Sequence, residues 1–277
     1  MAGTGENRIV VTGASSGIGR ACVSRFAQLG YTVFAGVRRP EDAEAVRAEN
    51  ITPVLLDVTN AESISSAVAA IGDGPLDGLV NNAGVAITGP LELVSIDAWR
   101  KQFDVNVFGM VAVTQALLPM LRQAKGRIVN VGSVAGRCAL PGSGAYDSSK
   151  FAIEAITDSL RMEVRPFGIS VSLIEPGSVV TPLWRKTFAD IDDLRKNSAP
   201  GIYEHYARLI ETLRSEAAEA AKKGVSVETV AAAVERAMTK RRPKTRYVIG
   251  SDGWLFVFLS LLPDRLRDSL ILSQLQK

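Results

Sequence analysis

Short apolar runs alternate along this chain with segments whose apolar residues recur every three or four positions. Runs that are apolar at nearly every position are typical of strands buried on both faces, and the recurrence between them is typical of amphipathic helices. The runs read RIVVTG, YTVFAGV, ITPVLLDV, LDGLVNNAG, GRIVNVGS, ISVSLIEPG and RYVIG. This alternation predicts an α/β fold with a doubly wound sheet of seven mostly parallel strands, flanked by helices.

Nothing in the pattern divides the chain, so residues 1–277 are expected to form a single domain. The alternation of strands and helices is interrupted at about residues 178–225, which are predicted to form a long, charged and mostly helical insertion. Insertions that follow the carboxyl end of a strand lie where open α/β sheets bind ligands. This segment is therefore predicted to be a substrate lid.

The C-terminal tail, about residues 253–277, begins with the apolar run GWLFVFLSLLP. The run is too short to span a bilayer, which needs about 20 residues. Packing against the core is the favoured interpretation. A cover over the substrate mouth, a subunit interface and peripheral contact with a membrane surface stay open.

Composition excludes several other classes of protein. A net charge of +3 and an aromatic content of 6% do not favour nucleic acid as a partner. Cys22 and Cys138 have no metal-ligand spacing and are expected to be buried thiols in a reducing compartment. With no signal pattern and no run of about 18 apolar residues, the protein is expected to be soluble and cytoplasmic.

The segment IVVTGASSGIGRACVSRFAQLG has the pattern of a strand, a glycine-rich turn and a helix. Gly13 permits a sharp turn, Gly17 leaves space for backbone approach, and Gly19 permits close packing of the helix on the strand. The N–H groups and positive dipole of the helix N-terminus suit a pyrophosphate group. A tight turn without a ligand is the alternative.

The end of the second strand predicts which dinucleotide is bound. An acidic residue there accepts hydrogen bonds from the adenosine ribose, whereas arginine accommodates the 2′-phosphate of NADP. The segment VFAGVRRPED supplies Arg38 and Arg39, which favours NADP(H). The alternative is an exposed turn in which the arginines pair with Glu41 and Asp42. Asp57, at the end of VLLDV, is a candidate partner for the adenine amino group or a helix cap.

Further segments along the chain form an ordered series. They are TGASSGIG (12–19), NNAG (81–84), DVNVFG (104–109), VGSVAG (131–136), YDSSK (146–150) and PGSVVTP (176–182). The series resembles the consecutive motifs of the short-chain dehydrogenase/reductases, over about Arg8 to Pro182, and implies a Rossmann-type fold. RYVIGSD and LLPDRLRDSLI are more loosely similar to the branch that contains 17β-hydroxysteroid and retinol dehydrogenases.

The resemblance implies a catalytic set of Asn106, Ser133, Tyr146 and Lys150. Tyr146 would be the general acid/base, with Lys150 lowering the pKa of its phenol and holding the nicotinamide ribose. The pair lies four residues apart, so a helix places both side chains on one face. Ser133 would hydrogen-bond the substrate oxygen, and Asn106 would hold a water that links Lys150 to solvent. No metal is expected, because the nicotinamide carries the hydride chemistry.

The same resemblance implies a cofactor site built from the segments that follow several strands. Its residues are Gly13, Ser15, Ser16, Gly17, Ile18, Gly19, Arg38, Asp57, Val58, Asn82, Ala83, Gly84, Tyr146, Lys150, Pro176, Gly177, Val179 and Thr181. Asn81 is expected to tie neighbouring strands together. For Asn82 a structural role stays open beside a cofactor contact.

The expected function is hydride transfer between NADP(H), with NAD less favoured, and a hydrophobic secondary alcohol or ketone of steroid, retinoid or lipid type. The candidate apolar lining is Val85, Leu140, Leu183, Trp184, Phe188 and Tyr203. A 3-oxoacyl-thioester reductase and a non-catalytic dinucleotide-binding regulator are the alternatives.

His205, the only histidine, is expected at the surface. The helices predicted near 96–121 and 146–164 are similar to those that pair subunits in this family, so a homodimer or homotetramer is expected.

Overall fold

Seven strands form one parallel sheet within the residues that the computed structural model describes, which are 7–182, 193, 194, 196 and 201–275. They are β1 (Arg8–Thr12), β2 (Thr32–Val37), β3 (Ile51–Leu55), β4 (Gly78–Asn81), β5 (Arg127–Val131), β6 (Ser170–Pro176) and β7 (Arg246–Ile249). Their order is β3-β2-β1-β4-β5-β6-β7. The winding reverses between β1 and β4, where a doubly wound sheet opens a crevice. The predicted fold class is confirmed.

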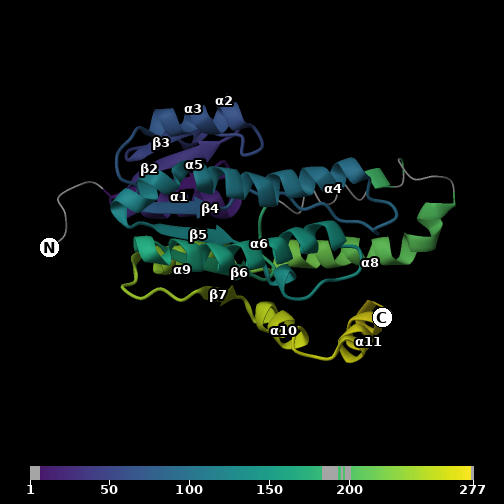
Figure 1. The fold of residues 1–277 in the computed structure, drawn as a ribbon. Helices are drawn as coiled ribbons and strands as arrows, with labels where there is room; N and C mark the ends of the chain where they lie inside the picture. The colour runs from purple at the N-terminus through teal and green to yellow at the C-terminus, as the bar shows by residue number, and fades with distance from the viewer. Residues whose placement is uncertain (1–6, 183–192, 195, 197–200, 276–277) are drawn as a thin grey trace.

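Helices cover both faces of the sheet (Figure 1). α1 (Gly17–Gln28) and α9 (Val227–Thr239) pack on one face, and α3 (Ala61–Ile71), α5 (Gly109–Ala124) and α6 (Gly144–Val164) pack on the other. The short α2 (Pro40–Val46) follows β2.

The two-sided cover explains the continuous apolar runs. In β1, Ile9 and Val11 pack toward α1 and α9, whereas Val10 packs toward the cluster of α3 and α5. In β2, Val33 and Ala35 belong to the first cluster and Phe34 to the second. A strand that is buried on both faces needs apolar side chains at successive positions, not at alternate ones.

Residues Ile96–Ala124 form one continuous helical stretch, made of α4 (Ile96–Phe103), a π-helical turn (Asp104–Phe108) and α5. By length and mean hydropathy alone this stretch could cross a membrane, and it is the one such helix among the described residues. Half of its most apolar window is buried inside the fold. Val113, Leu117 and Leu121 supply core contacts against the sheet and α3, which accounts for the composition.

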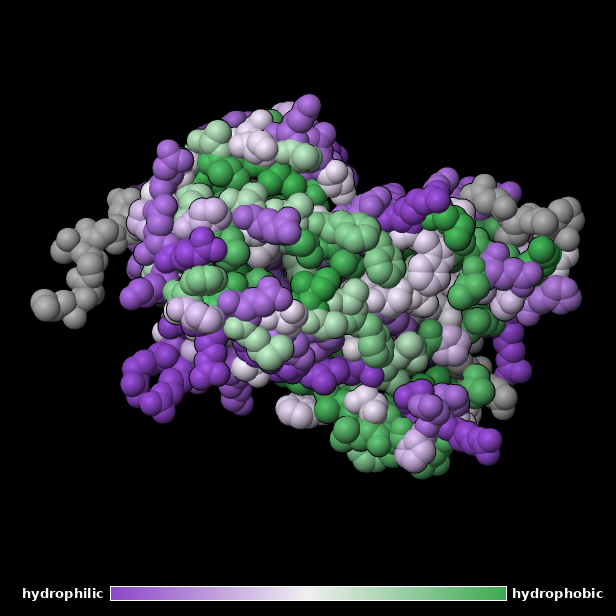
Figure 2. Space-filling model, in the orientation of Figure 1, coloured by the Kyte–Doolittle hydropathy of each residue, from purple (hydrophilic) through white to green (hydrophobic). Residues whose placement is uncertain are grey.

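Three C-terminal helices lie beyond the strand ends. They are α8 (Ile202–Lys223), α10 (Ser251–Leu259) and α11 (Asp264–Leu275). In Figure 1, α10 and α11 sit below α6 and α8, after β7. Figure 2 shows apolar side chains gathered on this protruding part, and Trp254, Phe258 and Leu261 are among its exposed residues.

Candidate active site

A cavity of about 1700 Å³ lies where the carboxyl ends of β1 to β6 meet α8, α10 and α11. A pocket for one drug-sized molecule measures roughly 300–1,000 Å³. This cavity is therefore large enough for a dinucleotide together with a substrate. The predicted site residues that line it are Gly13, Ser15, Ser16, Gly17, Ile18, Arg38, Asp57, Val58, Asn82, Ala83, Gly84, Ser133, Tyr146, Lys150, Pro176, Gly177, Val179 and Thr181.

The glycine-rich turn between β1 and α1 has the conformation that the sequence predicts. Gly13 and Gly17 have φ of 65° and 56°, a region that side chains with a Cβ rarely adopt. Gly19 does not line the cavity. A Cβ on Gly19 would lie 2.2 Å from the carbonyl oxygen of Gly13 and 2.5 Å from Nδ2 of Asn82, so only glycine lets α1 pack this closely.

The N-terminus of α1 fits a pyrophosphate group. Its N-cap residue, Ser16, makes no side-chain hydrogen bond to the helix, and the first turn carries no acidic residue. Backbone N–H groups and the positive end of the helix dipole therefore face the cavity without a competing anion.

The two arginines after β2 have different surroundings. Arg39 pairs with Asp42 at 2.9 Å and with Glu41 at 3.5 Å, as the alternative interpretation expected for both. Arg38 makes no hydrogen bond or ion pair with any described residue, and it lines the cavity. Its charge helps to lower the pKa of Asp57, after the larger effect of a hydrogen bond from Thr59. Arg38 is thus the guanidinium that remains for a phosphate.

The two neighbouring asparagines Asn81 and Asn82 have different roles. Asn81 donates to Asn130 of β5 and to Thr114 of α5, both at 2.9 Å, so it ties strands and helix together as predicted. Asn82 donates to the carbonyl oxygens of Thr12 and Gly13 at 3.0 and 3.2 Å. This contact fixes the glycine-rich turn, and Asn82 also lines the cavity.

Asn106 lies in the π-helical turn, is 2% exposed and does not line the cavity. Its Oδ1 accepts the N–H of Val85 at 2.8 Å, and its Nδ2 donates to the carbonyl oxygen of Val85 at 3.0 Å and to Ser149 at 3.1 Å. These bonds fix the segment after NNAG against α6. The water-holding role predicted for Asn106 remains a prediction.

Ser133, Tyr146 and Lys150 converge on one wall of the cavity. Ser133 follows β5, donates to the carbonyl oxygen of Pro176 at 3.3 Å and hydrogen-bonds the phenol of Tyr146. Nζ of Lys150 donates to the carbonyl oxygen of Val131 at 3.1 Å and lies 5.5 Å from the ring centroid of Tyr146. The helical spacing of the tyrosine and the lysine brings both beside the serine.

The lowering of the Tyr146 pKa was predicted for the site with its nicotinamide bound, and it remains a prediction. Burial raises the pKa of Tyr146 to about 12, although the hydrogen bond with Ser133 opposes the rise. Burial also lowers the pKa of Lys150 to about 8, which weakens the positive charge that was expected to stabilise a phenolate. Tyr146 is thus a protonated phenol at neutral pH, ready to donate.

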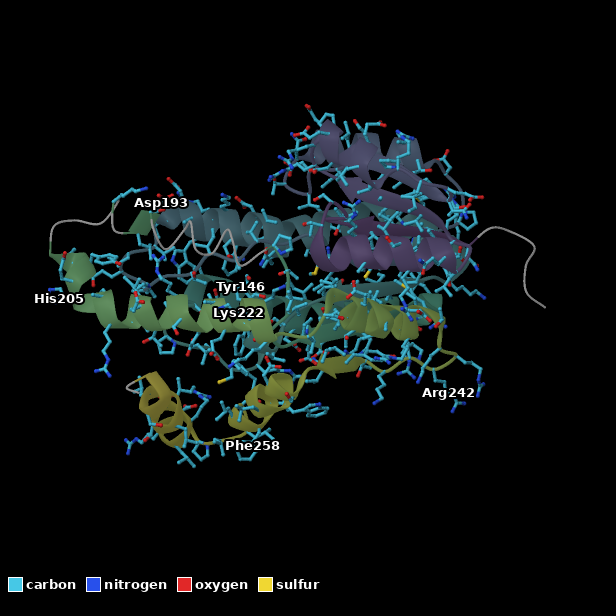
Figure 3. All side chains as sticks on the ribbon, turned by 180° about the vertical axis from the view of Figure 1, so that it is seen from behind. Tyr146, Asp193, His205, Lys222, Arg242 and Phe258 are labelled. Atoms are coloured by element: carbon cyan, nitrogen blue, oxygen red, sulfur yellow. The ribbon has the colours of Figure 1, made fainter. Side chains whose placement is uncertain are left out.

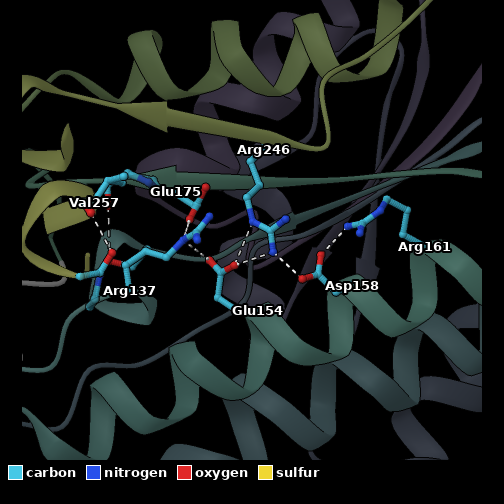
Figure 4. Close-up of polar contacts among 11 residues, drawn as sticks. Arg137, Glu154, Asp158, Arg161, Glu175, Arg246 and Val257 are labelled. Carbon is cyan, nitrogen blue, oxygen red and sulfur yellow. Dashed lines mark hydrogen bonds and ion pairs between the residues drawn. The ribbon is translucent and has the colours of Figure 1, made fainter. Parts of the chain in front are cut away.

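A network of charged side chains lies behind this wall (Figure 4). Arg137 donates to Glu175, which is fully buried, at 2.5 Å, and Arg246 bonds both Glu154 and Asp158. Burial, followed by a hydrogen bond with Glu175, raises the pKa of Glu154 to about 7. The network joins the segments that carry Ser133, Lys150 and Pro176.

The motif analysis missed two carboxylates. Asp147 lines the cavity next to Tyr146 and is 2% exposed. Asp252, at the start of α10, accepts the N–H of Ser178 at 2.7 Å and so fixes the turn after β6. Asp147 had a sequence signal, because it stands inside YDSSK. Asp252 ends the segment RYVIGSD, but its partner lies 74 residues away, so the local sequence did not predict this contact.

The predicted apolar lining is found in part. Val85 and Leu140 line the cavity, whereas Tyr203 packs in a small cluster with Ile210 and Leu213 instead. Leu183, Trp184 and Phe188 lie outside the described residues. The C-terminal helices contribute Leu255, Phe256, Phe258, Leu259, Leu270 and Ile271.

The single histidine is far from this chemistry. His205 lies near the outer end of α8, well away from Tyr146 (Figure 3). In the described part of the chain, no group of three or more His, Cys, Asp or Glu side chains could hold a metal ion.

The chain belongs to the short-chain dehydrogenase family. The family model described as short chain dehydrogenase matches residues 7–192. The protein is accordingly an NAD(P)-dependent oxidoreductase, and the predicted family is confirmed.

Curated relatives cover almost the whole chain. An NADPH-dependent 3-dehydrocapnine reductase of Ornithobacterium rhinotracheale is 37% identical over 97% of each chain. A 3-amino-tetrahydro-pyrrolizinone reductase of Xenorhabdus hominickii is 39% identical, over 88% of this chain and 87% of the relative. Retinol dehydrogenase 5 of Mus musculus is 36% identical, over 95% and 87%.

Solved structures show the same fold. A short-chain dehydrogenase from Streptomyces avermitilis aligns with a TM-score of 0.79 and 30% identity, covering 97% of this chain and 96% of that one. A short chain dehydrogenase from Burkholderia cenocepacia, in complex with NADP, aligns with a TM-score of 0.76 and 25% identity, covering 96% and 98%.

Proposed function

We propose that this protein interconverts hydrophobic ketones and secondary alcohols and prefers NADP(H) to NAD(H). The observation that carries the proposal is the convergence of Ser133, Tyr146 and Lys150 on one wall of a large, partly apolar cavity. A non-catalytic regulator would not need these three groups together.

The chain's own residues account for the proton chemistry. In reduction, Tyr146, which is protonated at neutral pH, donates its phenolic proton to the carbonyl oxygen. Ser133 donates a hydrogen bond to the same oxygen once its hydroxyl turns from Pro176, and so stabilises the developing charge. The bound nicotinamide supplies the hydride in this direction and accepts it in the reverse one. Lys150 is placed to hold the nicotinamide ribose and to return a proton to Tyr146.

Arg38 supports the preference for NADP(H). Both Arg38 and Arg39 line the cavity at the end of β2, but only Arg39 forms ion pairs with described carboxylates. Guanidinium groups pair with phosphate in a bidentate manner. The name of the Ornithobacterium relative, an NADPH-dependent reductase, agrees with this choice.

The cavity wall supports a hydrophobic substrate. Val85 and Leu140 on one side and Leu255, Phe256 and Leu259 of α10 on the other line it. Such a wall favours a bulky apolar alcohol or ketone over a sugar. A cytoplasmic location and assembly into a homodimer or homotetramer are predicted from the sequence alone, and we include both in the proposal.

The test is the change in absorbance of NADPH and of NADH over a panel of ketosteroids, retinal, acetoacetyl thioesters and aryl ketones. We expect turnover of bulky apolar ketones with NADPH. The Tyr146→Phe variant should lose a factor of about 10²–10⁴ in kcat, the usual contribution of general acid–base catalysis. Undiminished turnover by that variant would refute the assigned role, and turnover of the thioesters alone would favour the acyl-thioester alternative.

A further inference from the structure

Asp147 carries a carboxyl group that the proposed mechanism does not use. It follows Tyr146 in α6, is 2% exposed and lines the same cavity as Tyr146 and Lys150. Its Oδ2 accepts the N–H of Leu140 at 2.8 Å, which holds the apolar loop of Leu140 against α6. Within the described residues, no donor reaches Oδ1 and no cation pairs with the carboxylate.

A buried carboxylate without a partner is costly, because its charge loses the solvation of water. Burial accordingly raises the pKa of Asp147 to about 7, and only the hydrogen bond from Leu140 opposes the rise. The charged groups nearby do not change this. The Cys138 thiol is a neutral neighbour, and Arg267 of α11 pairs with Asp264 and Asp268. Oδ1 of Asp147 is therefore an acceptor that a ligand can bind.

The position of Asp147 limits where that ligand group can be. Tyr146 and Asp147 both line the cavity, and the charge of Asp147 contributes to the raised pKa of Tyr146, so the carboxylate lies near the phenol at which the substrate reacts. A cation on a neighbouring carbon of the substrate would meet Oδ1. An ammonium group pairs with a carboxylate more strongly than a neutral donor does, because the hydrogen bond is charge-assisted.

We propose that Asp147 binds an amino group on the substrate, next to the reacting carbon, and that the preferred substrates are hydrophobic amino alcohols and amino ketones. This inference rests on the proposed function at Tyr146. The amine takes no part in the redox step. In oxidation, the carbinol carbon loses a hydride to NADP⁺ and its hydroxyl loses a proton to Tyr146, while the C–N bond stays intact.

Three alcohols of nearly equal size test the inference. They are 2-amino-1-phenylethanol, 1-phenylethane-1,2-diol and 1-phenylpropan-1-ol, which place an ammonium, a hydroxyl or a methyl group at the same position. Their oxidation is followed by NADPH formation at pH 8, where Asp147 is mostly ionised. We expect kcat/KM of the wild type to fall in that order, with the amino alcohol at least about tenfold ahead of the methyl compound, a difference of about 1.4 kcal/mol.

The readout is the amino-to-methyl ratio of kcat/KM and not the absolute rate. Asp147→Asn keeps an oxygen that can accept the N–H of Leu140, so it removes the charge while leaving the loop contact. In this variant the ratio should fall to within about twofold of unity. Glu216→Gln is the matched control, because Glu216 is another carboxylate that lines the cavity, on α8, and the ratio in this variant should stay as in the wild type. A wild type without the preference, or an Asp147→Asn variant that keeps it, overturns the inference.

A second measurement separates this inference from the proposed function. The panel of ketones given above decides the proposed function. If none of these three alcohols is oxidised, binding alone decides the role of Asp147. 2-Amino-1-phenylethanol should raise the Tm of the wild type with NADP⁺ more than 1-phenylpropan-1-ol does, and Asp147→Asn should abolish the difference. Equal shifts in wild type and variant also overturn the inference.

Discussion

The reactivity of Tyr146 depends on the side chains that surround its phenol. Burial raises its pKa to about 12, and Ser133 is the neighbour whose hydrogen bond lowers it. Reduction needs the protonated phenol, which is the dominant form at neutral pH. Oxidation needs the phenolate, whose population grows as the pH rises toward the pKa.

Removing the hydroxyl of Ser133 should therefore move the pH dependence of oxidation. In Ser133→Ala the pKa of Tyr146 loses its main lowering contribution and rises further, so the rising limb of kcat/KM against pH should shift to higher pH. The rate at pH 8 should also fall by about 10²-fold or more, as for loss of an oxyanion donor. Ser143→Ala, in the same cavity wall, is the control. An unshifted limb in Ser133→Ala would contradict the assigned hydrogen bond.

Gly19 and Gly144 differ in the space available for a side chain. A Cβ at Gly19 would lie 2.2 Å from the backbone oxygen of Gly13, and this oxygen cannot move away without opening the turn. A Cβ at Gly144 would meet only the ring of Trp99, at 3.6 Å. We expect Gly19→Ala to lower the free energy of unfolding by about 1–3 kcal/mol, as overpacking does. Gly144→Ala should be neutral or slightly stabilising in the same urea titration, and equal effects would refute the close packing of α1.

At the scale of elements, the charged network holds the catalytic wall in place. Arg137 follows the short turn after Ser133, Glu154 lies one helical turn after Lys150, and Glu175 precedes Pro176. Their ion pairs link β6, β7 and α6 (Figure 4). Asp252 adds a second tie, from α10 to the turn after β6.

Removing Arg137 should destabilise the protein strongly, because Glu175 would stay buried with its charge uncompensated. For Arg137→Ala we expect a loss of about 3–5 kcal/mol at pH 8. Arg47→Ala is the control. Its partner Glu44 is largely exposed, so its loss should cost no more than about 1 kcal/mol. Urea unfolding of both variants measures this, and similar losses would contradict the role of burial.

At the scale of the molecule, the sequence predicted those features that depend on short stretches of residues. The apolar runs located all seven strands, and the glycine spacing located the turn that Gly13 and Gly17 form. The sequence left several possible places open for the C-terminal tail that forms α10 and α11. Nothing in the sequence near Phe256 indicates that this residue lines the cavity. The rise in the pKa of Tyr146 in the chain alone could not be predicted from the sequence, since burial is a property of the whole fold.

A ligand that touches the ends of six strands should stabilise the whole molecule. Binding to the folded state alone adds about 2.7 kcal/mol to the free energy of unfolding at a concentration one hundred times Kd. Because Arg38 is free to meet the 2′-phosphate, NADP⁺ should raise the Tm more than NAD⁺ at equal concentration. Arg38→Ala should remove that difference while leaving the shift with NAD⁺ nearly unchanged, and Arg39→Ala, whose guanidinium pairs with Asp42, should keep most of it. Equal shifts for the two dinucleotides in the wild type would mean that the end of β2 does not select the phosphate.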